Sequence, residues 1–165
     1  MANTPPPIAS EAGFQPAFKR VAQSGDLDDL IACVAMLANK SLIEVRKVAV
    51  EKFEVPEHGS WSLNEDMLKT LAAHFNWFTG VYREVSKIAD VPDLALLLVG
   101  YKENTARNGR HVLFHRQKAA AGVEYIIDPA YWINDDPAKQ IRMDVKSLPP
   151  PLWYIAVHAL KGANK

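Results

Sequence analysis

The chain has 165 residues and one cysteine, and its formal net charge is zero. A chain of this length can bury the core of a single domain, and its neutral charge predicts neither a nucleic-acid partner nor an anionic membrane partner. One cysteine excludes an internal disulfide and the usual structural zinc site and suits a reducing compartment, so we expect a cytoplasmic protein.

The first segment, residues 1–14, is rich in Pro, Ala and Ser and lacks the apolar stretch of a signal peptide. We expect it to form a flexible arm ahead of a single domain, residues 15–165. The apolar runs of the chain are all too short to cross a bilayer, so we expect no membrane partner.

The first predicted helix follows two adjacent acids. Asp28 or Asp29 can cap a helix that ends near Asn39. Residues 30–38 are apolar on every face, which predicts a buried central helix.

Two further helices are predicted by the capping-box pattern, in which a Ser caps the helix start and a Glu three residues later caps in return. Ser41 with Glu44 opens one of them, which runs toward Phe53. Ser62 with Glu65 opens the other. The first half of the chain is therefore helical in pattern.

The second half changes to the patterns of β-strands. The predicted strands are residues 93–101, 111–117, 123–128, 140–145 and 152–160. A polar turn, residues 102–110, separates the first two, and Asp128-Pro129 ends the third because a residue before proline is pushed to an extended conformation. Helices followed by an antiparallel sheet form an α+β arrangement.

Several short motifs stand in a characteristic order along this pattern. They are Gln23, Ala32-x-x-Ala35-Met36, Pro92 ahead of an apolar strand, His111, and Asp128-Pro129. In this order and spacing the chain resembles the papain-like cysteine peptidases, and among them the bacterial bacteriocin-processing peptidases for double-glycine leaders and their stand-alone relatives. The resemblance covers roughly residues 21–160. It implies a papain-like fold, with a helical N-terminal half packed on an antiparallel sheet from the C-terminal half.

The resemblance also implies a site for peptide hydrolysis. In such a site a thiolate at a helix N-terminus is stabilised by the helix dipole and a neighbouring imidazolium. Gln23 would be the oxyanion donor, His111 the general acid and base, and Asp128 the residue that orients the imidazole. The implied partner is a peptide or peptide-like ligand, and the implied site uses no cofactor and no metal.

The nucleophile is where this chain departs from the family. The position reads Asp29, counted either forward from Gln23 or backward from Ala32, and the Gly that should follow is Leu30. We therefore expect a homologue with impaired or lost catalysis that binds peptide-like ligands. Asp29 could imitate the charge of a thiolate and pair with protonated His111, or it could be only an acid favoured at a helix start.

The alternative is an active thiol hydrolase that uses Cys33 with His111 and Asp128. Cys33 lies one helical turn after Asp29, which displaces its sulfur by about 5–6 Å. A cysteine between Ala32 and Val34 is more typical of a small buried side chain than of a nucleophile.

The sequence also offers a candidate binding surface and a candidate set of metal ligands. Tyr131 and Trp132 follow Asp128-Pro129 directly and could line a cleft beside the site, whereas the remaining aromatic side chains are expected mostly in the core. Asp29, His111 and Asp128 have the ligand types of a metal site, although their spacing does not require one. The sequence does not predict an oligomeric state.

Overall fold

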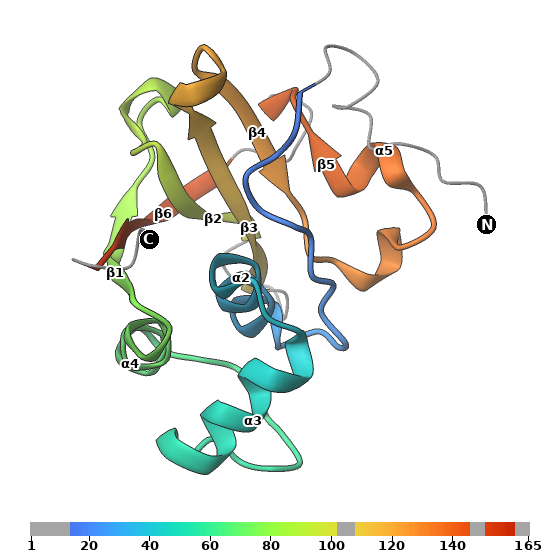
Figure 1. Cartoon of the computed structure of the whole chain (residues 1–165), viewed down its shortest axis with the longest axis vertical. Coiled ribbons are helices and arrows are strands. Elements are labelled where there is room, and N and C mark those ends of the chain that lie inside the picture. The colour runs from blue at the N-terminus through green and yellow to red at the C-terminus, as the bar shows by residue number, and fades with distance from the viewer. Residues whose placement is uncertain (1–13, 102–107, 146–150, 161–165) are drawn as a thin grey trace.

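The computed structural model describes residues 14–101, 108–145 and 151–160. Within these ranges the protein is α+β (Figure 1). The α-helices are α2 (Asp29–Ala38), α3 (Leu42–Phe53), α4 (Glu65–His74) and α5 (Pro137–Gln140). The strands are β1 (Trp77–Glu84), β2 (Leu94–Tyr101), β3 (Asn108–Gln117), β4 (Val123–Ile127), β5 (Ile141–Arg142) and β6 (Pro151–Ala159). Three short 3₁₀ turns, Ile88–Asp90, Lys118–Ala120 and Tyr131–Ile133, join them.

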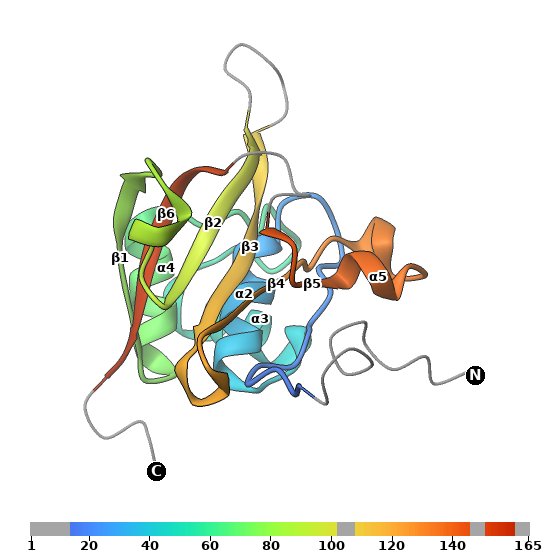
Figure 2. The same cartoon turned by 90° about the horizontal axis from the view of Figure 1, so that it is seen from above.

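The strands form one six-stranded sheet in the order β1-β6-β2-β3-β4-β5, and every pairing is antiparallel. Figures 1 and 2 show α2, α3 and α4 together on one face of this sheet, with α5 beside the short strand β5. His111 faces the helices, on the same side as the next-but-one residue Leu113, because side chains alternate along a strand. Arg110 and Val112 therefore point to the opposite face.

The central helix α2 confirms the prediction of a buried helix. Every residue from Asp29 to Leu37 is buried, and the helix packs between the sheet and α3. Asp28 occupies the N-cap position, but its side chain makes no capping hydrogen bond. The predicted N-cap position is therefore confirmed, but the expected capping hydrogen bond is absent because the carboxylate of Asp28 binds Ser24, Gly25 and Arg46.

The two capping-box predictions have different outcomes. Ser41 and Glu44 form the complete box at the start of α3. At α4 the predicted pair Ser62 and Glu65 is wrong, because Asn64 is the N-cap and its side chain accepts a hydrogen bond from the Met67 backbone N–H at 2.8 Å. Asn caps as well as Ser does, so the structure uses the cap that lies next to the first helical residue.

Most of the predicted strands are present. Strands β2, β3, β4 and β6 lie where the sequence predicts them, and β4 ends directly before Asp128. The expected strand at 140–145 is only the two-residue β5, preceded by α5, and residues 108–110 of the expected turn belong to β3. The rest of that turn, 102–107, lies outside the described residues. Strand β1 is an element that the sequence analysis did not predict.

The N-terminal arm begins to pack earlier than expected. Phe14 is buried, and its ring meets the ring of Tyr125 edge-on at 5.4 Å between centroids. Residues 1–13 of the predicted arm lie outside the described residues. No helix in the described ranges is long and apolar enough to cross a membrane.

Candidate functional site

Position 29 lies against His111. Asp29 is the first residue of α2, and its Oδ2 accepts hydrogen bonds from the His111 backbone N–H and from the ring at Nδ1, each at 2.7 Å. The two residues are nearly enclosed, with 9% and 8% of their surfaces exposed. Because a carboxylate only accepts, Nδ1 carries a hydrogen in this contact. The first residue of the helix and a histidine in the middle of the sheet thus form one buried pair.

The other ring nitrogen of His111 is held by a residue that the sequence analysis missed. The hydroxyl of Tyr82 lies 2.7 Å from Nε2. Burial, and then the charge of Asp29, raises the pKa of Tyr82 to about 12, so its phenol stays protonated at neutral pH. Both ring nitrogens of His111 therefore have partners within the protein.

Asp128 does not occupy the orienting role that the resemblance implies. Its carboxylate is 1% exposed and is bound by Arg110, with Nη2 at 2.8 Å and Nε at 3.2 Å, and by the backbone N–H of Ala130 at 3.0 Å. Arg110 precedes His111 on β3 and points to the opposite face of the sheet. The acid is thus committed to a guanidinium instead of the imidazole.

Gln23 is buried near the start of α2, but its amide is turned back to its own loop. Nε2 donates to the Gly25 carbonyl at 2.6 Å, and the backbone N–H donates to the Pro129 carbonyl at 2.8 Å. The buried Oε1 has no hydrogen-bond partner. As it stands, the amide is not aimed as the donor that an oxyanion would need.

Cys33 lies on the core side of His111. It is 0% exposed, and its thiol lies 3.9 Å from the backbone carbonyl oxygen of His111. Burial, followed by the charges of Asp29 and Asp128, raises the pKa of this thiol well above its ordinary value. A reactive cysteine needs the opposite conditions, exposure and a lowered pKa.

The loop ahead of α2 is fixed by Asp28. Its buried carboxylate accepts hydrogen bonds from the Ser24 hydroxyl at 2.6 Å, from the backbone N–H groups of Ser24 and Gly25 at 3.0 Å, and from Arg46 at 3.0 Å. The guanidinium of Arg46 lies 3.7 Å above the ring of Trp61. This network holds the chain that leads into Asp29, and so positions the acid against His111.

The aromatic pair predicted beside the site is on the surface. Trp132 is 55% exposed and lies 5.6 Å from the guanidinium of Arg110, while the Tyr131 hydroxyl donates to Asp26 at 3.1 Å. Of the Trp and Tyr side chains expected in the core, Tyr125 is buried, whereas Trp61, Trp77 and Tyr154 are half-buried and Trp153 is exposed, so that expectation is mostly wrong. The pair therefore links the strand that carries His111 to the loop before α2.

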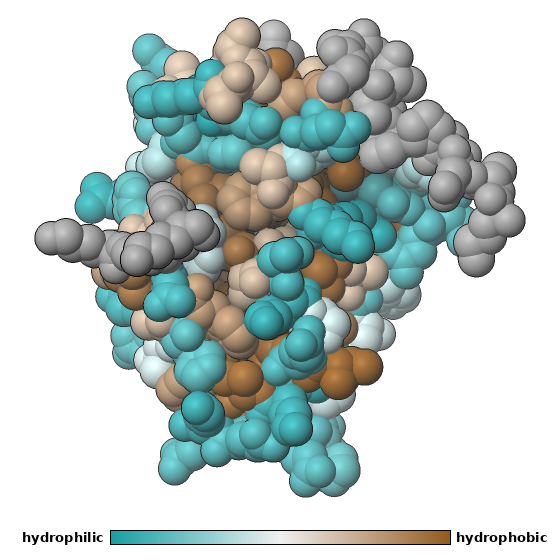
Figure 3. Space-filling view, viewed as in Figure 1, coloured by the Kyte–Doolittle hydropathy of each residue, from teal (hydrophilic) through white to brown (hydrophobic). Residues whose placement is uncertain are grey.

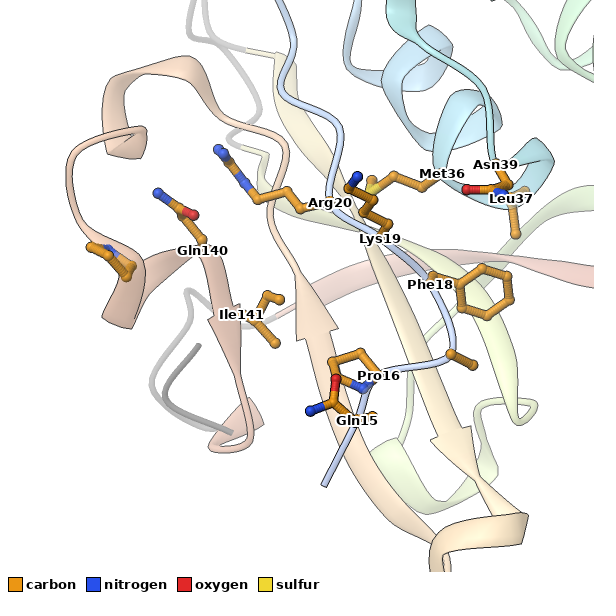
Figure 4. A pocket seen from close by; sticks show the side chains of 12 residues that line it. Gln15, Pro16, Phe18, Lys19, Arg20, Met36, Leu37, Asn39, Gln140 and Ile141 are labelled. Atoms are coloured by element: carbon orange, nitrogen blue, oxygen red, sulfur yellow. The ribbon is translucent and has the colours of Figure 1, made fainter. Parts of the chain in front are cut away.

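The cavity shown in Figure 4 is separate from Asp29 and His111. It has a volume of about 630 Å³ and lies between the N-terminal segment, the C-terminal end of α2 and strand β5, with Phe18, Met36 and Ile141 among its lining. Figure 3 shows apolar side chains gathered across the middle of one face, between hydrophilic side chains above and below. The cavity thus lies at the opposite end of α2 from Asp29.

Among the residues that the structure describes, no group of three or more His, Cys, Asp or Glu side chains is arranged to hold a metal ion. The metal alternative fails on geometry, since the carboxylate of Asp128 is bound by Arg110.

A comparison with protein-family models gives no match for this chain, and a comparison with curated proteins gives none either.

Proposed function

We propose that this protein is a papain-like peptidase homologue that has lost thiol chemistry and binds peptide-like ligands. The observation that carries the proposal is the pairing of Asp29 Oδ2 with His111 Nδ1 at 2.7 Å. Position 29 begins a buried helix and meets a strand-borne imidazole, which is the relation that a cysteine nucleophile and its histidine need. An acid in that position keeps the charge of a thiolate without its nucleophilicity.

The arrangement of the chain supports the same proposal. A central helix comes first, His111 lies on β3, and Asp128 follows the neighbouring strand β4. This order agrees with a papain-like fold, in which a helix packs against an antiparallel sheet. The single buried thiol is compatible with a cytoplasmic, reducing environment.

The contacts of the site argue against hydrolysis. The general acid and base of such a site works through the ring nitrogen that faces the nucleophile, but Nδ1 of His111 is bound to the carboxylate of Asp29, which is a poor nucleophile toward an amide. The amide of Gln23 is bound to Gly25, and the thiol of Cys33 is enclosed in the core. Each group that the reaction would use has another partner or is out of reach.

We assign ligand binding to an exposed surface that adjoins Arg110, on the opposite face of the sheet from the His111 ring, and that reaches the loop before α2 through Asp26. Tyr131 and Trp132 present aromatic surface beside Arg110, and large exposed aromatic side chains are common in binding sites. Because the resemblance is to peptidases for double-glycine leaders, the probe is a fluorescently labelled peptide in which Gly-Gly is followed by several further residues, so that it contains the bond after the double glycine.

The test measures binding and cleavage of this peptide together. We expect saturable binding by fluorescence polarisation, no cleavage over long incubation, and at least about tenfold weaker binding after Trp132→Ala, as for the loss of a buried aromatic anchor. The matched control is Phe78→Ala, since Phe78 is another exposed aromatic side chain, on β1, and its ring stacks on His158. Cleavage by the wild-type protein, or equal binding by Trp132→Ala, would overturn the proposal.

A second test restores the chemistry. The double variant Asp29→Cys, Leu30→Gly should react with iodoacetamide at position 29 at mildly acidic pH, about a hundredfold faster than an ordinary thiol, because the imidazolium and the helix start stabilise the thiolate. Peptide mapping by mass spectrometry separates this reaction from any at Cys33. A folded double variant whose Cys at position 29 reacts like an ordinary thiol would contradict the placement of the nucleophile.

A further inference from the structure

We propose that Tyr82 is the positioning residue of His111 and holds the ring so that Nδ1 faces position 29. The inference rests on the proposed function and assigns to Tyr82 the role that the resemblance gives to Asp128. It adds to the proposed site a residue of β1, a strand that contains none of the peptidase-like sequence motifs.

The contact itself is short and well placed. The Tyr82 hydroxyl is 2.7 Å from Nε2, and the two rings are tilted by 38° with their centroids 5.8 Å apart. With Asp29 on Nδ1, the ring is held at both nitrogens, which fixes its rotation as well as its position. A histidine held at one nitrogen only could still turn about its χ2 bond.

The sheet brings Tyr82 to this place. Strand β1 pairs with β6, and Tyr82 lies opposite Ile155 after a register shift that follows Thr79. Ile155 in turn lies opposite Leu96 of β2, and both are part of the core between the sheet and the helices. Because paired residues point to the same face, Tyr82 shares the helix-facing side of the sheet with His111.

Asp128 is not free to take this role. Its buried carboxylate already accepts from Arg110 and from the Ala130 backbone N–H. Turning it toward His111 would leave the half-buried guanidinium of Arg110 without its carboxylate partner, and breaking such pairs is costly. The orienting acid and the imidazole have therefore been separated by the two faces of the sheet.

A phenol suits both states of the ring. When the imidazole is neutral with its hydrogen on Nδ1, toward Asp29, the Tyr82 O–H donates to Nε2. If a thiolate stood at position 29 and the ring were an imidazolium, Nε2–H would donate to the same phenol oxygen. Tyr82 can thus hold His111 with either an acid or a thiolate at position 29.

The experiment compares tyrosine variants in the Asp29→Cys, Leu30→Gly background. Loss of the hydroxyl in Tyr82→Phe removes an acceptor from the imidazolium, so the thiol should titrate at higher pH and react with iodoacetamide about tenfold more slowly at mildly acidic pH. The matched control is Tyr154→Phe, because Tyr154 packs in the core on the other face of the sheet. Its titration should equal that of the background.

The rival variant is Asp128→Asn in the same background. We expect it not to raise the pH at which the thiol titrates, since removal of a nearby negative charge favours the thiolate. A raised titration in Asp128→Asn together with an unchanged one in Tyr82→Phe would overturn the assignment.

A measurement without the engineered thiol keeps the two proposals separate. In the protein with Asp29 intact, Tyr82→Phe should shift the ¹⁵N resonance of His111 Nε2, and Tyr154→Phe should not. If the double variant is inert but this shift is seen, the peptidase-like function fails and the role of Tyr82 stands. If the shift is absent, the role of Tyr82 fails.

Discussion

His111 and His115 lie four residues apart on the same face of β3, and each has a tyrosine hydroxyl within hydrogen-bonding distance. His115 Nδ1 is 2.9 Å from the hydroxyl of Tyr125, and no carboxylate of the described residues is paired with its ring. Burial lowers the pKa of His115 below its ordinary value, against an opposing effect of Asp93. His111 differs because the carboxylate of Asp29 binds its Nδ1.

The difference shows that the partner decides which ring nitrogen carries the hydrogen. At His111 the carboxylate accepts, so the hydrogen lies on Nδ1. At His115 the Tyr125 oxygen already accepts from the Ala17 backbone N–H at 3.1 Å, so its hydroxyl is left to donate to Nδ1. We therefore expect opposite tautomers when the two imidazoles are neutral. On the proposed function His111 belongs to a site, whereas His115 is a half-buried histidine whose ring packs against Phe18 and Tyr125.

The largest expected effect concerns the thiol behind His111. Cys33 should react with iodoacetamide at least about a thousandfold more slowly in the native protein than in urea, since its exposure requires unfolding and domains of this size are stable by several kcal/mol. Its raised pKa slows the reaction further at neutral pH. Rapid stoichiometric labelling of the native protein would show that Cys33 is accessible and activated beside His111. The proposed pairing of His111 with Asp29 in place of a thiolate would then be wrong.

The next largest effect is expected from removal of the Asp29 carboxylate, which binds His111 and has no counterpart at His115 among the described residues. Asp29→Ala leaves two buried N–H groups of His111 without an acceptor, so it should lower the free energy of unfolding by about 3 kcal/mol in urea titrations. The control is Asp66→Ala, because Asp66 is also an acid in the first turn of a helix but is exposed. Its cost should be below about 1 kcal/mol. An equal loss in the free energy of unfolding for the two variants would mean that Asp29 contributes only what any acid at a helix start contributes.

The sequence predicted the fold better than it predicted the site, and one strand explains much of the difference. In β1 the register with β6 shifts between Thr79 and Tyr82, around Gly80, so apolar and polar side chains do not alternate regularly. The pattern that reveals strands was therefore absent, and Tyr82 was missed with it. Strands β2, β3, β4 and β6 keep their patterns and were predicted.

The orienting residue was misassigned for a related reason. Residues 108–110 were placed in a turn because Asn108-Gly109 is a turn signature, whereas they begin β3. A turn gives no direction to Arg110, but a strand points it away from His111 and toward Asp128. Sequence spacing predicted which residues come together at Asp29 and His111, and could not predict how carboxylates are shared among competing cations.

A loss of stability at alkaline pH is expected from the tyrosines beside both histidines, Tyr82 beside His111 and Tyr125 beside His115. The pKa values of Tyr82 and Tyr125 are each raised to about 12, mainly by burial. Since the folded state holds these phenol protons more tightly than the unfolded state, stability is complete below the ordinary pKa of about 10 and is lost as pH rises from there toward 12. Tyr82→Phe and Tyr125→Phe should each make this fall shallower in urea titrations at increasing pH. An unchanged slope in both would mean that the phenols are not protected.

The smallest effect is expected at His115. Tyr125→Phe removes the hydrogen bonds to His115 and to Ala17, and should lower the free energy of unfolding by about 1 kcal/mol. In the Asp29→Cys, Leu30→Gly background it should leave the iodoacetamide reaction unchanged. A change in that reaction would mean that His115 also influences the thiol at position 29, so the two histidines would not differ in function as proposed.

The tautomers of the two histidines test the central claim most directly. In ¹⁵N spectra of the ring nitrogens at neutral to alkaline pH, we expect a hydrogen on Nδ1 of His111 and on Nε2 of His115. We also expect that Asp29→Ala weakens the Nδ1–H preference of His111 and leaves the tautomer of His115 unchanged. A wild-type His111 with an unprotonated Nδ1 would show that Asp29 does not hold the imidazole in place of a thiolate, and would contradict the account.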